Sequence, residues 1–274
     1  MDGYQVYRDA MTKDQWQGWW VTWPLSTRVR LGHVYDRKSD GVRRAGDLAA
    51  RGIPFQREHG TPDGTFIYDS NESVDVAFKA SGKTPAALSA LTEADAGASV
   101  TFTRGRTAFV VFREYSQSGI SDVRGLSHAL VSAWWNKEWD DSLLAVTSVV
   151  AAAGATVLTA AEGGAVAELK VSASAGVGEL GMADLALGAS VVRHSALGAQ
   201  WTGTDVTPFY QVIRLRKNWL GKIVAEYGPR PPGRGALPSA LPPLLSEEIG
   251  DDPEAALEPG DRTEELPFHD PENE

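Results

Sequence analysis

The feature that most constrains this chain is a two-residue alternation between residues 165 and 192. The first run of its apolar positions consists of Ala165, Ala167, Leu169, Val171, Ala173, Ala175 and Val177. A turn-like segment follows at 178–181, and the apolar positions resume at Ala183, Leu185, Leu187, Ala189 and Val191. Because successive side chains of a strand point to opposite faces, this pattern predicts a long amphipathic β-hairpin.

The length of this hairpin sets its two interpretations. Strands in soluble proteins usually have about 5–6 residues, whereas a tilted strand needs about 9–11 residues to cross a bilayer. The apolar face suits lipid, and the opposite face, which carries Glu168 and Lys170, suits a water-filled lumen. A lone hairpin would leave its edges unpaired in lipid, so crossing requires many copies closed into a barrel. The alternative is a long hairpin in a soluble sheet.

The rest of the body alternates between strand and helix patterns. We expect strands at 73–81, at 100–112 on either side of Gly105, and at 143–161, divided in two at Gly154. Segment 143–161 has no charged residue, but its Ala, Thr, Ser and Gly content favours buried strands over a transmembrane helix. Helical periodicity predicts helices at 8–20 and 120–136. The predicted fold class is α+β, with a twisted, mostly antiparallel central sheet, long amphipathic hairpin regions and flanking helices.

The C-terminal part differs sharply in composition. Residues 229–274 contain 12 of the 36 acidic residues, 3 of the 26 basic residues and 10 of the 15 prolines. We therefore divide the chain into a body, 1–228, and an acidic, Pro-rich tail, 229–274. Such a composition is typical of a disordered, solubilising segment. However, an apolar helical stripe favours docking of the tail onto an apolar groove. The stripe consists of Leu237, Leu241, Leu244, Leu245 and Ile249.

Residues 28–51 are locally basic, and the four arginines of interest are Arg28, Arg30, Arg43 and Arg44. They are consistent with a solvated face, or with contact to anionic phospholipid head groups. We do not expect nucleic acid as a partner, because the body is close to neutral, with 24 acidic and 23 basic residues. Tryptophans 16, 19, 20 and 23 suit either a core or a membrane interface.

Sequence motifs give no support for an enzyme. The chain has no cysteine, which excludes disulfides, thiolate metal sites and a cysteine nucleophile. The five histidines are scattered, without paired-His metal spacing or a G-x-S-x-G elbow. We therefore expect no catalytic residue, no cofactor and no metal. The first residues lack the apolar region of a secretory signal, so a cytoplasmic location is expected.

The order of these parts resembles the pore-forming domain of bacterial gasdermins. The hairpin stretches 73–113 and 165–195, separated by the helix at 120–136, are similar to the family's membrane-inserting regions. Segments 31–34 (LGHV), 143–150 and 207–215 also resemble stretches of that family, the last two being its apolar and closing strands. The resemblance implies a latent, non-enzymatic pore-former that kills its own cell in antiviral defence. It would be cytoplasmic when latent and would act at the cell membrane.

The resemblance also implies an activation sequence. A protease would cut between body and tail, with Arg234 as the candidate site for a trypsin-like enzyme and Asp251 or Asp252 for an Asp-directed one. The freed body would bind anionic membrane and assemble into a large homo-oligomer. The inserting residues would be Leu169, Val171, Val177, Leu185, Leu187 and Val191, and the inhibitory contacts Leu241, Leu244, Leu245 and Ile249. The alternative is a soluble interaction module whose tail binds a partner protein.

Overall fold

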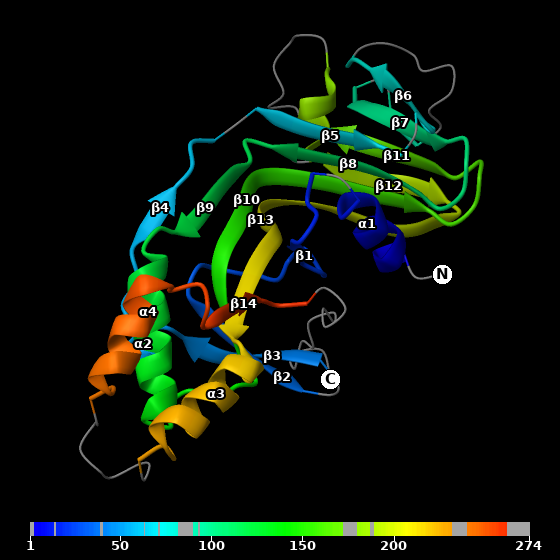
Figure 1. Ribbon diagram of the computed structural model, residues 1–274. Coiled ribbons are helices and arrows are strands. Elements are labelled where there is room, and N and C mark those ends of the chain that lie inside the picture. The colour runs from blue at the N-terminus through cyan, green and yellow to red at the C-terminus, as the bar shows by residue number, and fades with distance from the viewer. Residues whose placement is uncertain are drawn as a thin grey trace.

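A computed structural model describes residues 3–13, 15–38, 41–62, 64–70, 72–81, 90–92, 94–171, 180–186, 189–231 and 240–261. In this part of the chain, four α-helices combine with two antiparallel sheets, so the α+β class is confirmed; α2, α3 and α4 lie together at one end of the molecule (Figure 1). The helices are α1 (Gly3–Met11), α2 (Val123–Trp135), α3 (Lys217–Tyr227) and α4 (Pro243–Asp251). Two 3-10 helices, η1 (Ala49–Arg51) and η2 (Met182–Ala186), complete the helical elements of these residues.

The larger sheet is built on two long strands, β10 (Leu143–Ala160) and β13 (Leu197–Leu215), which pair along nearly their whole length. The other edge of β10 pairs in turn with β2 (His33–Lys38), β9 (Ser116–Ile120) and β8 (Thr107–Arg113). Outside these lie β3 (Gly41–Asp47), β4 (Arg57–His59) and β5 (Thr65–Asp69). The outer edge of β13 pairs with β1 (Trp20–Val21) and β14 (Leu257–Pro259).

The smaller sheet has four strands, two from each of the predicted hairpin stretches. These strands are β6 (Val74–Lys79), β7 (Ala96–Phe102), β11 (Val166–Val171) and β12 (Ala189–Ser195), in the spatial order β12-β11-β7-β6. The pairing of β7 with β11 joins the two hairpin stretches side by side. Segments that are distant in sequence therefore form one sheet.

Three apolar clusters hold these layers together. The first lies under α2, α3 and α4 and includes Trp135, Trp219 and Leu245. The second places α1, Trp16 and Trp19 on one face of β8 and β10. The third fills the space between the opposite face of those strands and the smaller sheet. The centre of the larger sheet is thus buried on both faces.

The prediction of a helix at 8–20 was wrong. Helix α1 ends at Met11, residues 15–18 form turns, and β1 begins at Trp20. Gly18 adopts a left-handed backbone with φ of 82°, which an α-helix does not allow. The Trp16 ring stacks on Phe209 with ring centroids 4.5 Å apart, so packing overrides the local helical pattern.

Two further predictions need correction. Segment 143–160 is one strand without a turn at Gly154, because Gly154 pairs on both sides, with Thr204 and Arg113. Residues 182–186, expected in a strand, form η2. There the Asp184 carboxylate accepts a hydrogen bond from the Gly181 N–H at 2.8 Å, a local turn that competes with strand pairing. The expected strands at 73–81 and on either side of Gly105, and the helix at 120–136, are confirmed within a few residues.

Candidate functional site

The two sheets are connected by four short links that preserve strand order. Each strand of the smaller sheet adjoins a strand of the larger one along the chain: β5 with β6, β7 with β8, β10 with β11, and β12 with β13. In the larger sheet the paired order is β5-β8-β10-β13, and in the smaller sheet it is β6-β7-β11-β12. The smaller sheet is therefore a continuation of a four-stranded block of the larger one, turned back at the links.

Each link contains one residue in the left-handed region. These residues are Glu72 (φ 53°), Arg106 (φ 58°), Gly164 (φ 82°) and Ala196 (φ 56°). A non-glycine residue pays roughly 1–2 kcal/mol for this conformation. We call the four links together the link row.

Backbone hydrogen bonds join neighbouring links to one another. The Phe102 N–H donates to the Ala165 carbonyl at 2.8 Å, and the Gly164 N–H donates back to the Phe102 carbonyl at 2.7 Å. The Thr103 N–H donates to the Ser73 carbonyl at 2.9 Å. These hydrogen bonds join the first link to the second and the second link to the third. Three of the four links therefore form a continuous row.

The link row changes which face alternate residues occupy. On β8, Val110 and Phe112 belong to the cluster under α1, whereas Phe109 and Val111 face the smaller sheet. On the preceding strand β7, the even-numbered residues lie in the third cluster instead, although Val110 and Phe112 are also even-numbered. These residues are Ala98, Val100 and Phe102. The same relation holds between Phe66 and Val76 on β5–β6 and between Val157 and Leu169 on β10–β11.

The structure places the predicted inserting residues as follows. Leu169 and Val171 are fully buried in the third cluster, and Val191 packs against it. Leu185 is buried in η2 and not in a strand, which corrects its expected setting. Val177 and Leu187 lie outside the described residues. The structure thus brings Leu169, Val171, Leu185 and Val191 into one core, while their insertion stays a prediction.

A loop segment covers the polar face of the smaller sheet. We call residues 90–95, of which 93 is not described, the strap. The ammonium of the buried Lys79 donates to the carbonyls of Thr92 and Asp95, both at 2.6 Å. Glu168, also buried, accepts from the Ala90 N–H at 2.8 Å. Lys170 pairs with Asp95 at 2.6 Å, and this bond holds the pKa of Asp95 well below its usual range.

Of the four predicted head-group residues, two share a recess with acids and one forms an ion pair. Arg28 and Arg30 line a recess of about 320 Å³ together with Glu114 and Asp205. Arg44 forms a 3.1 Å ion pair with Asp47, and Arg43 is exposed on the same strand. Their contact with lipid head groups stays a prediction.

The buried His33 lies between these basic residues. Its Nδ1 accepts from the Arg30 backbone N–H at 3.3 Å and lies 3.4 Å from the Tyr35 hydroxyl. Burial, assisted by the charge of Arg44, lowers the pKa of His33 to about 4. Burial likewise raises the pKa of Tyr35 above its ordinary value.

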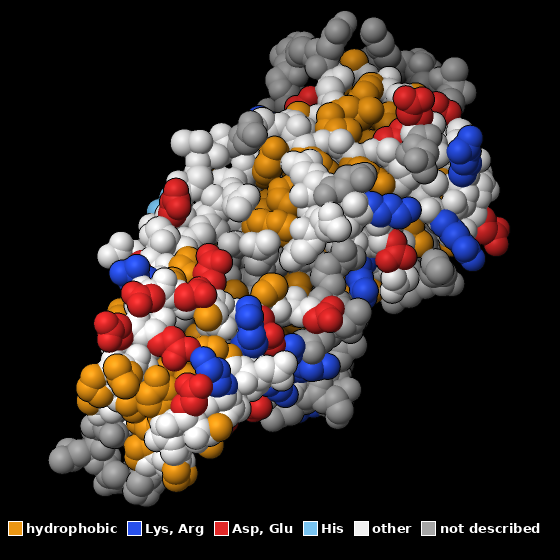
Figure 2. Space-filling view, viewed as in Figure 1, with side chains coloured by type: hydrophobic (Ala, Val, Ile, Leu, Met, Phe, Trp, Pro, Cys, Tyr) orange, Lys and Arg blue, Asp and Glu red, His pale blue; other side chains and the backbone are white. Residues whose placement is uncertain are grey.

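The described part of the tail is attached to the body by a helix and a strand. Helix α4 packs against α2, and β14 pairs antiparallel with β13 from Leu257 opposite Leu215 to Pro259 opposite Ile213. Arg214 bonds to Glu258 at 2.7 Å, and Glu248 receives a 3.2 Å hydrogen bond from Lys222, which raises the pKa of Lys222. Figure 2 shows acidic and basic side chains interleaved over this end of the molecule.

The tail residues expected to dock behave differently from one another. Leu245 and Ile249 are buried in the first cluster, and Leu241 packs partly against it. Leu244 is 69% exposed, so its predicted contact with the body is wrong. A helix of nine residues presents Leu245 and Ile249 to α2, and Leu244 then points outward. Leu237 and the candidate cleavage site Arg234 lie outside the described residues.

Sequence reasoning missed the polar contacts of the strap and the tail. Nothing in the pattern near Lys79 distinguishes it from a solvated lysine of an alternating strand. Likewise, Glu258 is one acid among the tail's many, and only the pairing of β14 with β13 places it beside Arg214. The buried His33 was noticed only as part of the LGHV segment.

The described residues contain neither a metal-binding cluster nor a membrane-spanning helix. No group of three or more His, Asp or Glu side chains in the described segments is arranged to hold a metal ion. Among the helices of those segments, none has both the length and the apolar character needed to span a membrane.

The resemblance to known proteins comes from solved structures. No family model matches the sequence, and no curated protein matches it. Among solved structures, a bacterial gasdermin from Bradyrhizobium tropiciagri is similar over 73% of this chain and 82% of its own, at 14% identity and a TM-score of 0.29. Neither the identity nor the TM-score reaches the level that establishes a shared fold.

Proposed function

We propose that this chain is a latent pore-forming effector of the gasdermin type, kept inactive by its tail and released by proteolysis. The observation that carries the proposal is the link row, across which strand order is preserved. If the four links straighten, the two sheets merge into four continuous strands without exchanging a neighbour. One of them would run from Ala96 to Arg113, longer than the roughly 9–11 residues that cross a bilayer.

The side-chain pattern supports the same change. In a straight strand, residues of one parity share a face, so Ala98, Val100 and Phe102 would align with Val110 and Phe112 on one apolar face. The opposite face of the smaller-sheet strands carries Asp75, Lys79, Ser99, Glu168 and Lys170. An apolar face toward lipid and a polar face toward water is the pattern of strands that line an aqueous pore.

Closure of such a sheet requires more than one copy. A four-stranded block has two edges, and edges are not tolerated in hydrocarbon. Its outermost strands, β5 and β13, are oriented so that β13 of one copy would meet β5 of the next in antiparallel fashion. We therefore infer a ring of copies as the active form, with anionic membrane as its partner and the cell membrane as its site.

In this proposal the tail acts at a distance from the link row. Helix α4 and β14 lie at the end of the molecule that holds α2 and α3, whereas the smaller sheet lies at the other end (Figure 1). Inhibition would therefore come from covering a surface that neighbouring copies need. Cleavage in the segment that joins α3 to α4, where Arg234 lies, would disconnect the covering elements from the body.

The test uses the full chain with a specific protease site introduced at Arg234-Gly235. Vesicles of phosphatidylcholine and phosphatidylglycerol are loaded with dye, and leakage is followed before and after cutting. We expect leakage only after cutting. A cut protein that keeps its circular dichroism spectrum and releases no dye would refute the proposal.

A second measurement locates the inserted face. The absence of native cysteine allows single-cysteine labelling with an environment-sensitive fluorophore. Phe78 and Ala77 are both exposed, but they lie on opposite faces of β6. After activation we expect a label at Phe78→Cys to enter hydrocarbon and one at Ala77→Cys to remain in water. The reverse result, or no difference, would contradict the face assignment.

A further inference from the structure

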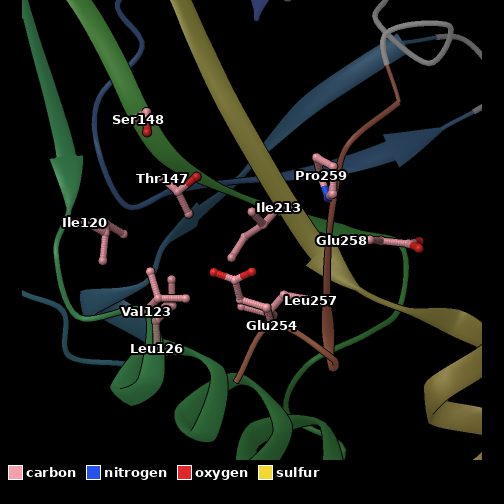
Figure 3. Close-up of a pocket in the computed structure, with 10 residues that line it drawn as sticks. All are labelled: Ile120, Val123, Leu126, Thr147, Ser148, Ile213, Glu254, Leu257, Glu258 and Pro259. Atoms are coloured by element: carbon pink, nitrogen blue, oxygen red, sulfur yellow. The ribbon is translucent and has the colours of Figure 1, made fainter. Parts of the chain in front are cut away.

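A cavity of about 260 Å³ lies at the junction between tail and body. The body contributes Ile120, Val123, Leu126, Thr147, Ser148 and Ile213, and the tail contributes Glu254, Leu257, Glu258 and Pro259 (Figure 3). The cavity exists in this form only while the tail is docked. Its volume is slightly below the usual range for ligand sites, about 300–1,000 Å³, so it suits only a small molecule.

The walls of the cavity are mostly apolar, and three of the ten lining residues, Ile120, Leu126 and Leu257, are buried. Leu126 of α2 is 2% exposed and Leu257 of β14 is 7% exposed. Thr147 lies at a bulge of β10, where the register with β13 shifts between Val146 and Ser148. A bulge bends its strand locally, which opens space beside the start of α2.

One carboxylate, that of the solvent-exposed residue Glu254, lies beside this apolar space without a counter-ion among the described ion pairs. Figure 3 shows the Glu254 carboxylate between the side chains of Val123 and Ile213, whereas the Glu258 carboxylate points outward, where it pairs with Arg214 at 2.7 Å. None of the ion pairs or side-chain hydrogen bonds described for the resolved segments involves Glu254. A turn in which the Leu257 N–H donates to the Glu254 carbonyl at 3.2 Å fixes its backbone.

We propose that this cavity is a binding site for a small aliphatic primary amine. The ammonium group would pair with Glu254, and the hydrocarbon chain would lie along Val123, Leu126 and Leu257. A carboxylate beside apolar walls complements a ligand that combines a positive charge with apolar surface. Neutral molecules would gain only the apolar contact, and anions would be repelled.

Binding at this site would regulate release of the tail, an inference that rests on the proposed function. The tail supplies part of the cavity wall, so a ligand that needs the complete wall binds only the docked state. By thermodynamic linkage, the ligand then stabilises that state by an amount that grows with the logarithm of its concentration above the dissociation constant. An amine in this cavity would therefore keep the protein latent after the chain has been cut.

The test measures binding to the full-length chain with three probes of equal chain length: hexylamine, hexanol and hexanoate. We expect hexylamine to bind about fivefold more tightly than hexanol, a difference typical of a partly exposed ion pair, and hexanoate to bind most weakly. Glu254→Gln should remove the preference for the amine while hexanol still binds. Glu247→Gln, an exposed acid of α4, is the control and should change nothing.

Variants that fill the cavity provide a second test of the binding site. Val123 is 38% exposed at the start of α2, so Val123→Trp can close the cavity with little effect on the core; Ser148→Leu is the substitute if thermal unfolding shows loss of fold. Either variant should abolish binding of hexylamine and of hexanol. Equal affinity for the three probes, or an unchanged preference in Glu254→Gln, would overturn the proposal. These measurements involve no membrane, so their failure would leave the pore-forming proposal untouched.

Discussion

The guanidinium of Arg214 and the carboxylate of Glu258 bond at 2.7 Å, which joins the tail strand β14 to the central strand β13. Both side chains are largely shielded from water, with exposed fractions of 18% and 26%. Arg216 adds a hydrogen bond to the Leu257 carbonyl at 3.1 Å. The tail is therefore held by directional polar contacts as well as by apolar burial, and each contribution can be tested separately.

Substitution of Glu258 by Gln should loosen β14. It leaves the Arg214 guanidinium without its anionic partner, at a cost of about 1–3 kcal/mol to tail docking. Amide hydrogen exchange at residues 254–260 should become faster. Glu247→Gln on α4 is the matched control, and equal protection in both variants would show that the ion pair does not hold the tail.

Leu245 and Leu244 provide an adjacent pair for the apolar contribution. Leu245 is fully buried, so Leu245→Ala should weaken tail docking by about 2–5 kcal/mol. Leu244 is 69% exposed, and Leu244→Ala should stay within about 0.5 kcal/mol of the parent. Limited proteolysis of the tail and thermal unfolding are the readouts. Similar effects of the two substitutions would contradict the placement of α4.

Gly164 isolates the backbone contribution of the link row. It has φ of +82°, and a Cβ atom there would meet no atom within 4 Å. Gly164→Ala should therefore destabilise the latent fold by about 1–2 kcal/mol through backbone conformation alone. Gly221→Ala, in helix α3 and also in open space, should instead stabilise by about 0.5–1 kcal/mol.

Chemical denaturation of the two glycine variants measures both changes. If the proposed straightening occurs, vesicle leakage after cutting should also be faster for Gly164→Ala, because the latent link is disfavoured. No change in stability would show that Gly164 does not need its left-handed backbone.

Lys79 tests the strap. Lys79→Met keeps the length of the side chain but removes both hydrogen bonds to the carbonyls of Thr92 and Asp95, which should cost about 1–3 kcal/mol. Lys170→Met is the comparison, because Lys170 is about half exposed and its loss should have a smaller effect. Hydrogen exchange at residues 90–92 and 94–97 reports opening of the strap.

The sequence predicted the elements of this fold better than their assembly. Alternation at 74–79 and 166–171 and helical periodicity at 123–135 reflect local geometry, so these elements were predicted correctly. The continuous strand through Gly154 was not, because pairing on both edges outweighs the weak strand tendency of glycine, and such pairing is not visible in a single segment.

For the candidate site too, local geometry could be predicted from the sequence, whereas long-range strand pairing could not. That Leu169 and Val171 share a face follows from parity, and both are buried together. Left-handed backbone at Glu72, Arg106 and Ala196 is not favoured by those residue types, and it exists because the surrounding hydrogen bonds determine it. The row of links therefore could not be inferred without the pairing of β7 with β11.

His33 should make stability depend on pH in a defined window. Its pKa is lowered from 6.5 to about 4 in the folded state, so the unfolded chain binds the proton first as pH falls. The contribution of neutral His33 to stability is therefore fully present above pH 6.5 and is lost as pH falls toward 4. The loss is at most about 3 kcal/mol, because the pKa difference is 2.5 units and each unit corresponds to 1.36 kcal/mol.

His33→Gln cannot take up this proton, so its stability should change less over the same interval. His128→Gln, at a surface ring that bonds Ser246 at 3.0 Å, is the control and should follow the parent. Urea unfolding at half-unit pH steps gives the difference between parent and variant directly, and parallel curves for the parent and His33→Gln would show that His33 is not buried in its neutral form.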